Sequence, residues 1–126
     1  MESTRHEERP VYPSLAALLG NDVCRVGVVL CVFHHMVSND LRQMEHAVVA
    51  GEWMHVRELA HRTAWGCRFI GEDQAADALD AIEHSGHDAF EGDAFVQTFW
   101  SAHGTLRAVL DRAATYAGVR ARGRTD

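Results

Sequence analysis

The chain of 126 residues lacks the long hydrophobic run that would place it in a membrane. A membrane-spanning helix needs roughly 18 to 20 predominantly apolar residues. The longest apolar run here extends only from Val26 to Phe33, where His34 and His35 end it. The first ten residues are polar and contain no apolar signal-peptide region. We therefore expect a soluble, cytoplasmic protein with no membrane partner.

Positive charge is also in deficit. The chain has 12 Lys and Arg residues against 18 Asp and Glu residues, and its formal net charge is -6. A nucleic-acid surface needs a concentrated basic patch to neutralise phosphates. We therefore expect no nucleic-acid partner.

Cysteine is sparse and nucleotide-binding motifs are missing. Cys24, Cys31 and Cys67 form no CxxC pair, and all three fall on apolar stretches. They are typical of reduced core thiols in the cytosol. The sequence contains no GxxxxGKS/T loop and no Gly-rich kinase box, so no nucleotide site is expected.

The chain does contain apolar residues at helical spacing. After a flexible leader over residues 1–13, the pattern predicts a short helix from Ser14 to Leu18 or Leu19. A long helix follows Asn21-Asp22 and ends at Gly51, and its seven apolar seam positions step by four and three. These positions are Val26, Leu30, Phe33, Val37, Leu41, Met44 and Val48.

Three more helices are predicted in the second half. One extends from Trp53 to Arg68, the next begins at Glu72-Asp73 after Gly71, and a loop from His84 to Asp93 follows. The last helix begins near Phe95 and ends at Gly118, and a basic, disordered tail is expected over residues 119–126.

No segment suggests a strand, so the helices must bury their apolar faces against one another. We therefore predict an all-α fold over residues 14–118: an antiparallel four-helix bundle with a short extra N-terminal helix.

His61 is the candidate reactive residue. It lies roughly opposite the apolar stripe of its helix and is expected to face solvent, although an exposed histidine is also a common surface residue. A neutral imidazole, with an ordinary pKa of about 6.5, offers a nucleophilic nitrogen at cellular pH. Neighbouring arginines can attract and orient a phosphate. The residues expected on the same face are Arg57, Ala64, Trp65 and Arg68.

Several short motifs occur in a characteristic order along residues 15–83. They are Leu18-Leu19-Gly20-Asn21-Asp22, Phe33 in the long seam, Gly51-Glu52-Trp53, Leu59-Ala60-His61, Gly71 and the Leu79 to Glu83 helix end. In order and spacing they resemble the histidine-containing phosphotransfer (HPt) domains of bacterial two-component phosphorelays.

The resemblance implies a function for His61. It would take a phosphoryl group from the aspartyl phosphate of one response-regulator receiver domain and pass it to a second receiver. The implied partners are receiver domains and a hybrid sensor histidine kinase. The Mg²⁺ ion is expected on the receiver, so this chain needs no cofactor or metal. It would be a phosphotransfer intermediate rather than a kinase.

The sequence departs from the family pattern beside His61. Family members usually have Lys three residues and Gly four residues after the histidine, where this chain has Ala64 and Trp65. Arg68 is expected to supply positive charge, and Gly66 to relieve crowding. Trp65 is either an interface anchor or a partly buried edge residue.

These departures leave a second function open. The chain would then be a phosphorylation-impaired, HPt-like binding module that docks on a receiver or kinase to inhibit or scaffold it. Metal binding by His84, His87 and Asp88 is not favoured, because their spacing in a glycine-containing loop is loose.

Overall fold

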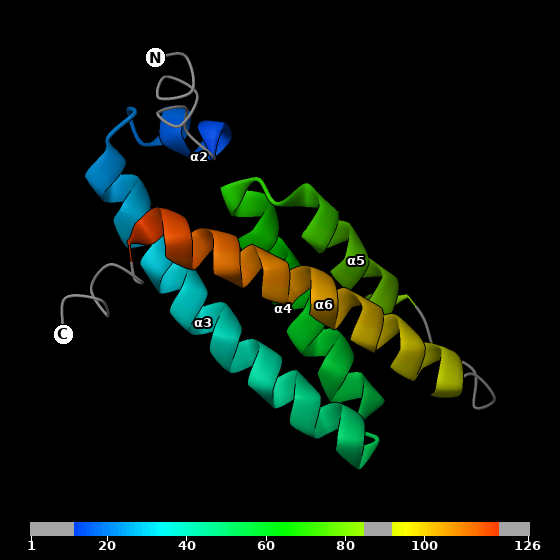
Figure 1. Cartoon of the computed structure of the whole chain (residues 1–126). Helices are drawn as coiled ribbons and strands as arrows, with labels where there is room; N and C mark the ends of the chain where they lie inside the picture. Colours follow the sequence, from blue (N-terminus) through cyan, green and yellow to red (C-terminus); the bar gives the residue numbers. More distant parts are fainter. Residues whose placement is uncertain (1–11, 85–91, 119–126) are drawn as a thin grey trace, which may run out of the picture.

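The computed structural model describes residues 12–84 and 92–118, and all regular secondary structure within these ranges is helical. This confirms the predicted all-α class (Figure 1). None of the described helices is long and apolar enough to span a membrane. The helices are α2 (Pro13–Leu18), α3 (Val23–Ala50), α4 (Trp53–Ile70), α5 (Asp73–Glu83) and α6 (Gly92–Ala117).

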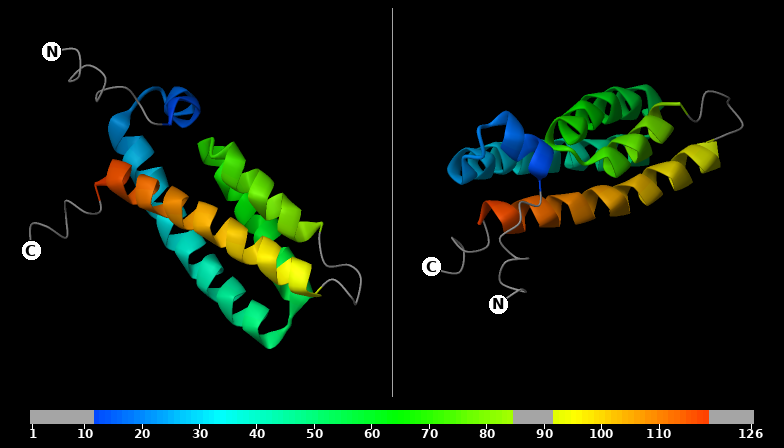
Figure 2. Two further views of the ribbon diagram at one scale, coloured as in Figure 1. Left: turned by 45° about the vertical axis from the view of Figure 1, so that its right-hand side comes forward. Right: turned by 90° about the horizontal axis from the view of Figure 1, so that it is seen from above.

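The four longer helices lie side by side, and each contacts two others. Helix α3 contacts α4 and α6, and α5 contacts the same two helices. Successive helices run in opposite directions, and α2 lies at the end of the array where α3 begins (Figures 1 and 2). The arrangement is consistent with the predicted bundle and its extra N-terminal helix.

Local chemistry explains where the helices begin and end. The Asp22 side chain accepts hydrogen bonds from the backbone N–H groups of Cys24 and Arg25, at 3.0 and 3.3 Å, and so caps α3. Gly51 ends α3 with a φ of 74° and Gly71 ends α4 with a φ of 90°. Glycine adopts this left-handed conformation without the steric penalty of a Cβ atom. The predicted end of α3 at Gly51 is confirmed, whereas α4 continues two residues beyond the predicted Arg68, to Ile70.

The core follows the predicted apolar pattern. All seven seam positions of α3 are buried, and Phe95 and Phe99 of α6 are also fully buried. Two polar side chains, Asp40 of α3 and Thr63 of α4, are buried with them. The Arg62 guanidinium donates to the Asp40 carboxylate at 2.7 Å, and the Thr63 hydroxyl lies 3.3 Å from it. These contacts join α3 to α4 and compensate for the burial of the Asp40 charge.

The N-terminal boundary differs from the prediction. Tyr12 is buried, its hydroxyl donates to Glu72 at 2.8 Å, and its ring meets that of Tyr116 edge-on at 5.7 Å. Pro13 is the first residue of α2. The predicted flexible leader is therefore wrong for residues 12 and 13, because a long-range contact holds Tyr12. The rest of the leader, residues 1–11, and the predicted tail, residues 119–126, lie outside the described residues.

Two smaller predictions also need correction. The predicted loop ends earlier, because Gly92 and Asp93 already belong to α6; residues 85–91 lie outside the described part. Of the three cysteines, only Cys67 is buried, whereas Cys24 is exposed and Cys31 is intermediate. Cys24 lies in the first turn of α3, before the first buried residue of that helix, Val26.

The Tyr12 contact predicts a specific pH dependence of stability. Burial and the hydrogen bond to Glu72 raise the pKa of Tyr12 above its ordinary value of 10.0. The folded protein thus retains the Tyr12 proton at pH values where the unfolded chain loses it. This stabilisation is fully present below about pH 10 and is lost as the pH rises further.

We expect Tyr12→Phe to lower the free energy of unfolding by about 1 kcal/mol at neutral pH, because one hydrogen bond is lost. Between about pH 9 and pH 11 the same variant should lose less stability than the wild type, because its ring cannot ionise. Urea unfolding at several pH values measures both effects. If the free energy of unfolding changed equally with pH in the two proteins, the raised pKa of Tyr12 would be contradicted.

Candidate functional site

His61 lies in the middle of α4, and 57% of its side chain is exposed, as predicted. Its Nδ1 atom lies 3.1 Å from one carboxylate oxygen of Glu83 and 3.0 Å from the other. An ionised carboxylate only accepts hydrogen bonds, so the imidazole proton lies on Nδ1. The lone pair of the neutral ring is then on Nε2.

Glu83 reaches His61 from the last residue of α5. Leu79 and Ile82 are buried and fix α5 against the core, whereas the Glu83 side chain is 30% exposed. From the sequence, Glu83 was predicted only as part of a helix end, and its contact with His61 was not predicted. The signal was present: His61 lies ten residues before Gly71 and Glu83 twelve residues after it. Residues at similar distances from the turn of an antiparallel helix pair lie opposite each other.

Trp65 lies one helical turn after His61 and contacts the other ring nitrogen. Its indole N–H donates to Nε2 of His61 at 3.4 Å. The side chain is 63% exposed, so Trp65 is not the partly buried edge residue that was one of the two expectations. A single tautomer of His61 satisfies both contacts, with Nδ1 donating to Glu83 and Nε2 accepting from Trp65.

The arginines of α4 point toward neighbouring helices. Arg68 forms an ion pair with Asp80 of α5. The Arg57 guanidinium lies over the Phe95 ring of α6, 5.2 Å from its centroid, which is within cation–π range. Arg68 must therefore leave Asp80, and Arg57 must leave Phe95, before either can orient a phosphate as expected.

Ala64 is not on the exposed face where the sequence analysis placed it. Only 1% of it is accessible, and Ala60 beside it is fully buried. Helix α4 contacts both α3 and α5, so its buried arc is wider than a single apolar stripe. The predicted accessibility of Ala64 is therefore wrong. The side chain at this position, where HPt domains usually have lysine, is a buried methyl group.

Gly66 faces α3 rather than His61. A Cβ atom added at Gly66 would lie 3.7 Å from the ring of Phe33. On an α-helix, positions 61 and 66 differ by about 140°, so a small residue at 66 does not open space beside the imidazole. The expectation that Gly66 relieves crowding at His61 is therefore wrong.

Comparison with known proteins reveals no relative. The chain matches no family model, no curated protein and no solved structure.

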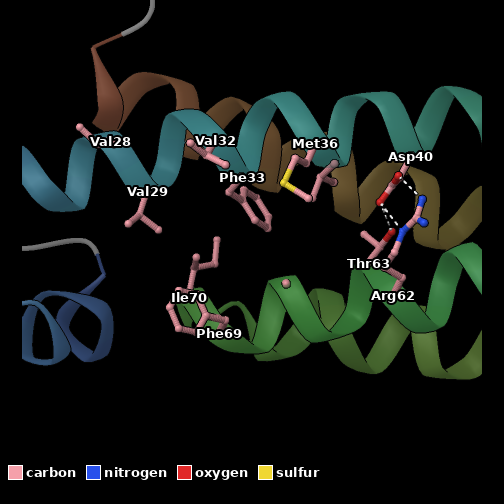
Figure 3. A pocket seen from close by; sticks show the side chains of 12 residues that line it. Val28, Val29, Val32, Phe33, Met36, Asp40, Arg62, Thr63, Phe69 and Ile70 are labelled. Carbon is pink, nitrogen blue, oxygen red and sulfur yellow. Dashed lines mark hydrogen bonds and ion pairs between the residues drawn. The ribbon is translucent and has the colours of Figure 1, made fainter.

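An apolar pocket of about 320 Å³ lies between α3 and α4. Val32 and Met36 on one side and Phe69 on the other are each more than half exposed, and Asp40, Arg62 and Thr63 lie at one end (Figure 3). The apolar pattern does not predict this pocket, because Val32 and Met36 lie outside the predicted seam. The remaining lining residues are Val28, Val29, Phe33, Val37, Gly66 and Ile70.

The described part of the chain brings together no group of three or more metal-binding side chains. His84 belongs to that part, and its Nδ1 atom lies 2.8 Å from the backbone carbonyl oxygen of Asp80. His87 and Asp88, the other two residues considered for metal binding, lie outside the described residues.

The tautomer of His61 can be measured directly. Replacing Glu83 by Ala removes the acceptor at Nδ1 and should raise the fraction of His61 that carries its proton on Nε2. The ¹⁵N chemical shifts of the ring nitrogens report this fraction. Asp80→Asn alters the Arg68 ion pair but leaves Glu83 in place, so it should keep the wild-type tautomer. Identical shifts in the wild type and Glu83→Ala would show that Glu83 does not select the tautomer.

Proposed function

We propose that this chain is an HPt-type histidine phosphotransfer protein, with Nε2 of His61 as the phosphoryl acceptor. The observation that carries the proposal is the hydrogen bond between Nδ1 and Glu83, which leaves the lone pair of an exposed imidazole on Nε2. Helices α3 to α6 form an antiparallel four-helix bundle in this proposal, α2 is the extra helix, and the protein acts in the cytoplasm.

The proposed transfer needs no proton to move. The Nε2 lone pair attacks the phosphorus of a receiver's aspartyl phosphate in line. The N–P bond forms, the P–O bond breaks, and its electron pair leaves with the aspartate carboxylate. The ring keeps its Nδ1 proton and becomes positively charged, and the Glu83 carboxylate at 3.0 Å stabilises that charge. The reverse reaction on a second receiver completes the relay.

The partners in this proposal are those implied by the resemblance to HPt domains. The phosphoryl donor and acceptor are receiver domains of response regulators and of a hybrid sensor histidine kinase, and Mg²⁺ on the receiver offsets the phosphoryl charge. In this proposal the chain needs no nucleotide site and no cofactor of its own, and it acts as an intermediate rather than a kinase. Arg68, which has 37% of its side chain exposed, is our candidate for contacting the phosphoryl oxygens after it leaves Asp80.

A second function is favoured by one observation, the contact of Trp65 with Nε2. If that contact persists in complexes, the chain is an HPt-like binding module that docks on a receiver or kinase to inhibit or scaffold it. Receiver binding without phosphoryl transfer distinguishes this function from the first.

His61→Gln should abolish labelling by phosphorylated receiver domains. The label on the wild type should be stable in alkali and lost in acid, as expected for a phosphorus–nitrogen bond. His55→Gln is a matched control, because His55 is on the same helix, is 48% exposed and lies 3.9 Å from Glu58. That control should label normally. Label that persists in a folded His61→Gln protein would rule out His61 as the acceptor.

Substitutions of Glu83 should separate the contribution of its charge to the transfer rate from the contribution of its hydrogen bond. Glu83→Gln keeps an oxygen that can accept from Nδ1 but removes the negative charge, so we expect transfer to slow roughly tenfold. Glu83→Ala removes both and should slow transfer further. Rapid-quench measurement of phosphoryl transfer gives both rates. A wild-type rate in Glu83→Ala would show that Glu83 does not contribute to the reaction.

A further inference from the structure

The nitrogen that must attack the phosphoryl group is the one that Trp65 contacts. The indole N–H donates to Nε2 of His61 at 3.4 Å, and the imidazole has no other nitrogen with a lone pair while Nδ1 donates to Glu83. A lone pair that accepts a hydrogen bond cannot form a bond to phosphorus at the same time. The reacting atoms must also come within about 3 to 3.5 Å of each other, along the direction that the indole now occupies.

The hydrogen bond between the Trp65 indole and Nε2 of His61 is weak and exposed. Its length of 3.4 Å is at the long end for a hydrogen bond, and 63% of Trp65 is exposed. Neither ring is held in the buried core, so the indole can rotate away about its side-chain bonds while α4 stays intact. Since only one long hydrogen bond is lost, we expect rotation of the indole away from Nε2 to cost little free energy.

An apolar surface continues from Trp65 on the same side of α4. Phe69 lies one further turn along the helix, is 54% exposed, and forms part of the wall of the apolar pocket between α3 and α4. Val32 and Met36 stand on the opposite wall (Figure 3). A receiver that presents apolar side chains here offsets the lost hydrogen bond by burying the displaced indole.

From these contacts we infer that Trp65 is a specificity-determining cap on the acceptor nitrogen. His61 transfers phosphoryl groups only with receivers whose surface draws the indole away from Nε2, and receivers without an apolar contact for Trp65 react slowly. This inference rests on the proposed function, since it concerns regulation of the same site.

Acylation by diethyl pyrocarbonate tests the cap without any receiver. The Nε2 lone pair attacks a carbonyl carbon of the reagent, an N–C bond forms and a C–O bond breaks. Ethyl carbonate leaves and decomposes to ethanol and carbon dioxide, and the ring then loses its Nδ1 proton to solvent. Mass spectrometry of the His61 peptide gives the rate at this one residue.

Trp65→Phe removes the N–H donor and keeps an aromatic ring, whereas Trp65→Ala removes both. We expect Trp65→Phe to acylate His61 about two- to tenfold faster than the wild type, the range for loss of one solvent-exposed hydrogen bond. Trp65→Ala should react at least as fast as Trp65→Phe. Trp100→Phe is the matched control, because Trp100 is 45% exposed and its ring lies 4.9 Å from that of His103 on α6. It should leave the His61 rate unchanged.

Phosphoryl transfer from a panel of receivers then tests selectivity. Trp65→Ala should narrow the spread of rates across the panel by raising the slowest ones. Equal acylation rates in the wild type and both Trp65 variants would refute the inference that Trp65 caps Nε2 of His61. Faster acylation with an unchanged spread of transfer rates would overturn its role in specificity. Faster acylation together with no label from any receiver would leave the cap in place and refute the proposed function instead.

Discussion

The burial of α4 on two sides is the constraint on which the site depends. Leu59 and Ile70 are both within a few per cent of complete burial, and α4 contacts α3 as well as α5. Each such side chain contributes about 1.5 to 3 kcal/mol, whereas an exposed hydrogen bond contributes about 1 kcal/mol. Core packing therefore fixes the exposed arc of α4, and the contacts of His61 follow from it.

Two hydrogen bonds determine how available the Nε2 lone pair of His61 is, and their effects on it are opposite. The Glu83 contact comes from a neighbouring helix and puts the proton on Nδ1. The Trp65 contact comes from the same helix and occupies the lone pair that the first contact makes available. The first contact thus depends on tertiary packing, whereas the second depends on local helical spacing.

Under the proposed function, the charges around His61 leave part of the catalysis to the partner. Arg62 and Arg68 are held by Asp40 and Asp80, and Glu83 puts a carboxylate beside the ring. In the proposed reaction, a phosphoryl group at His61 would meet few uncommitted positive charges from the described residues around it. Under the proposed function, neutralisation of its oxygens thus falls to the receiver and its Mg²⁺, and transfer depends on how closely the receiver can approach.

Local sequence determined the helices and the exposure of His61. Asp22, Gly51 and Gly71 set helix boundaries through contacts within a few residues, and a period of 3.6 residues gives the angle of each side chain around its own axis. Tertiary structure alone decided the remainder: the burial of Ala64, the partner of Arg68 and the inclusion of Tyr12 in the fold. Periodicity does not say how many neighbours a helix has, nor which distant residue faces each position, because those depend on how helices far apart in sequence pack together.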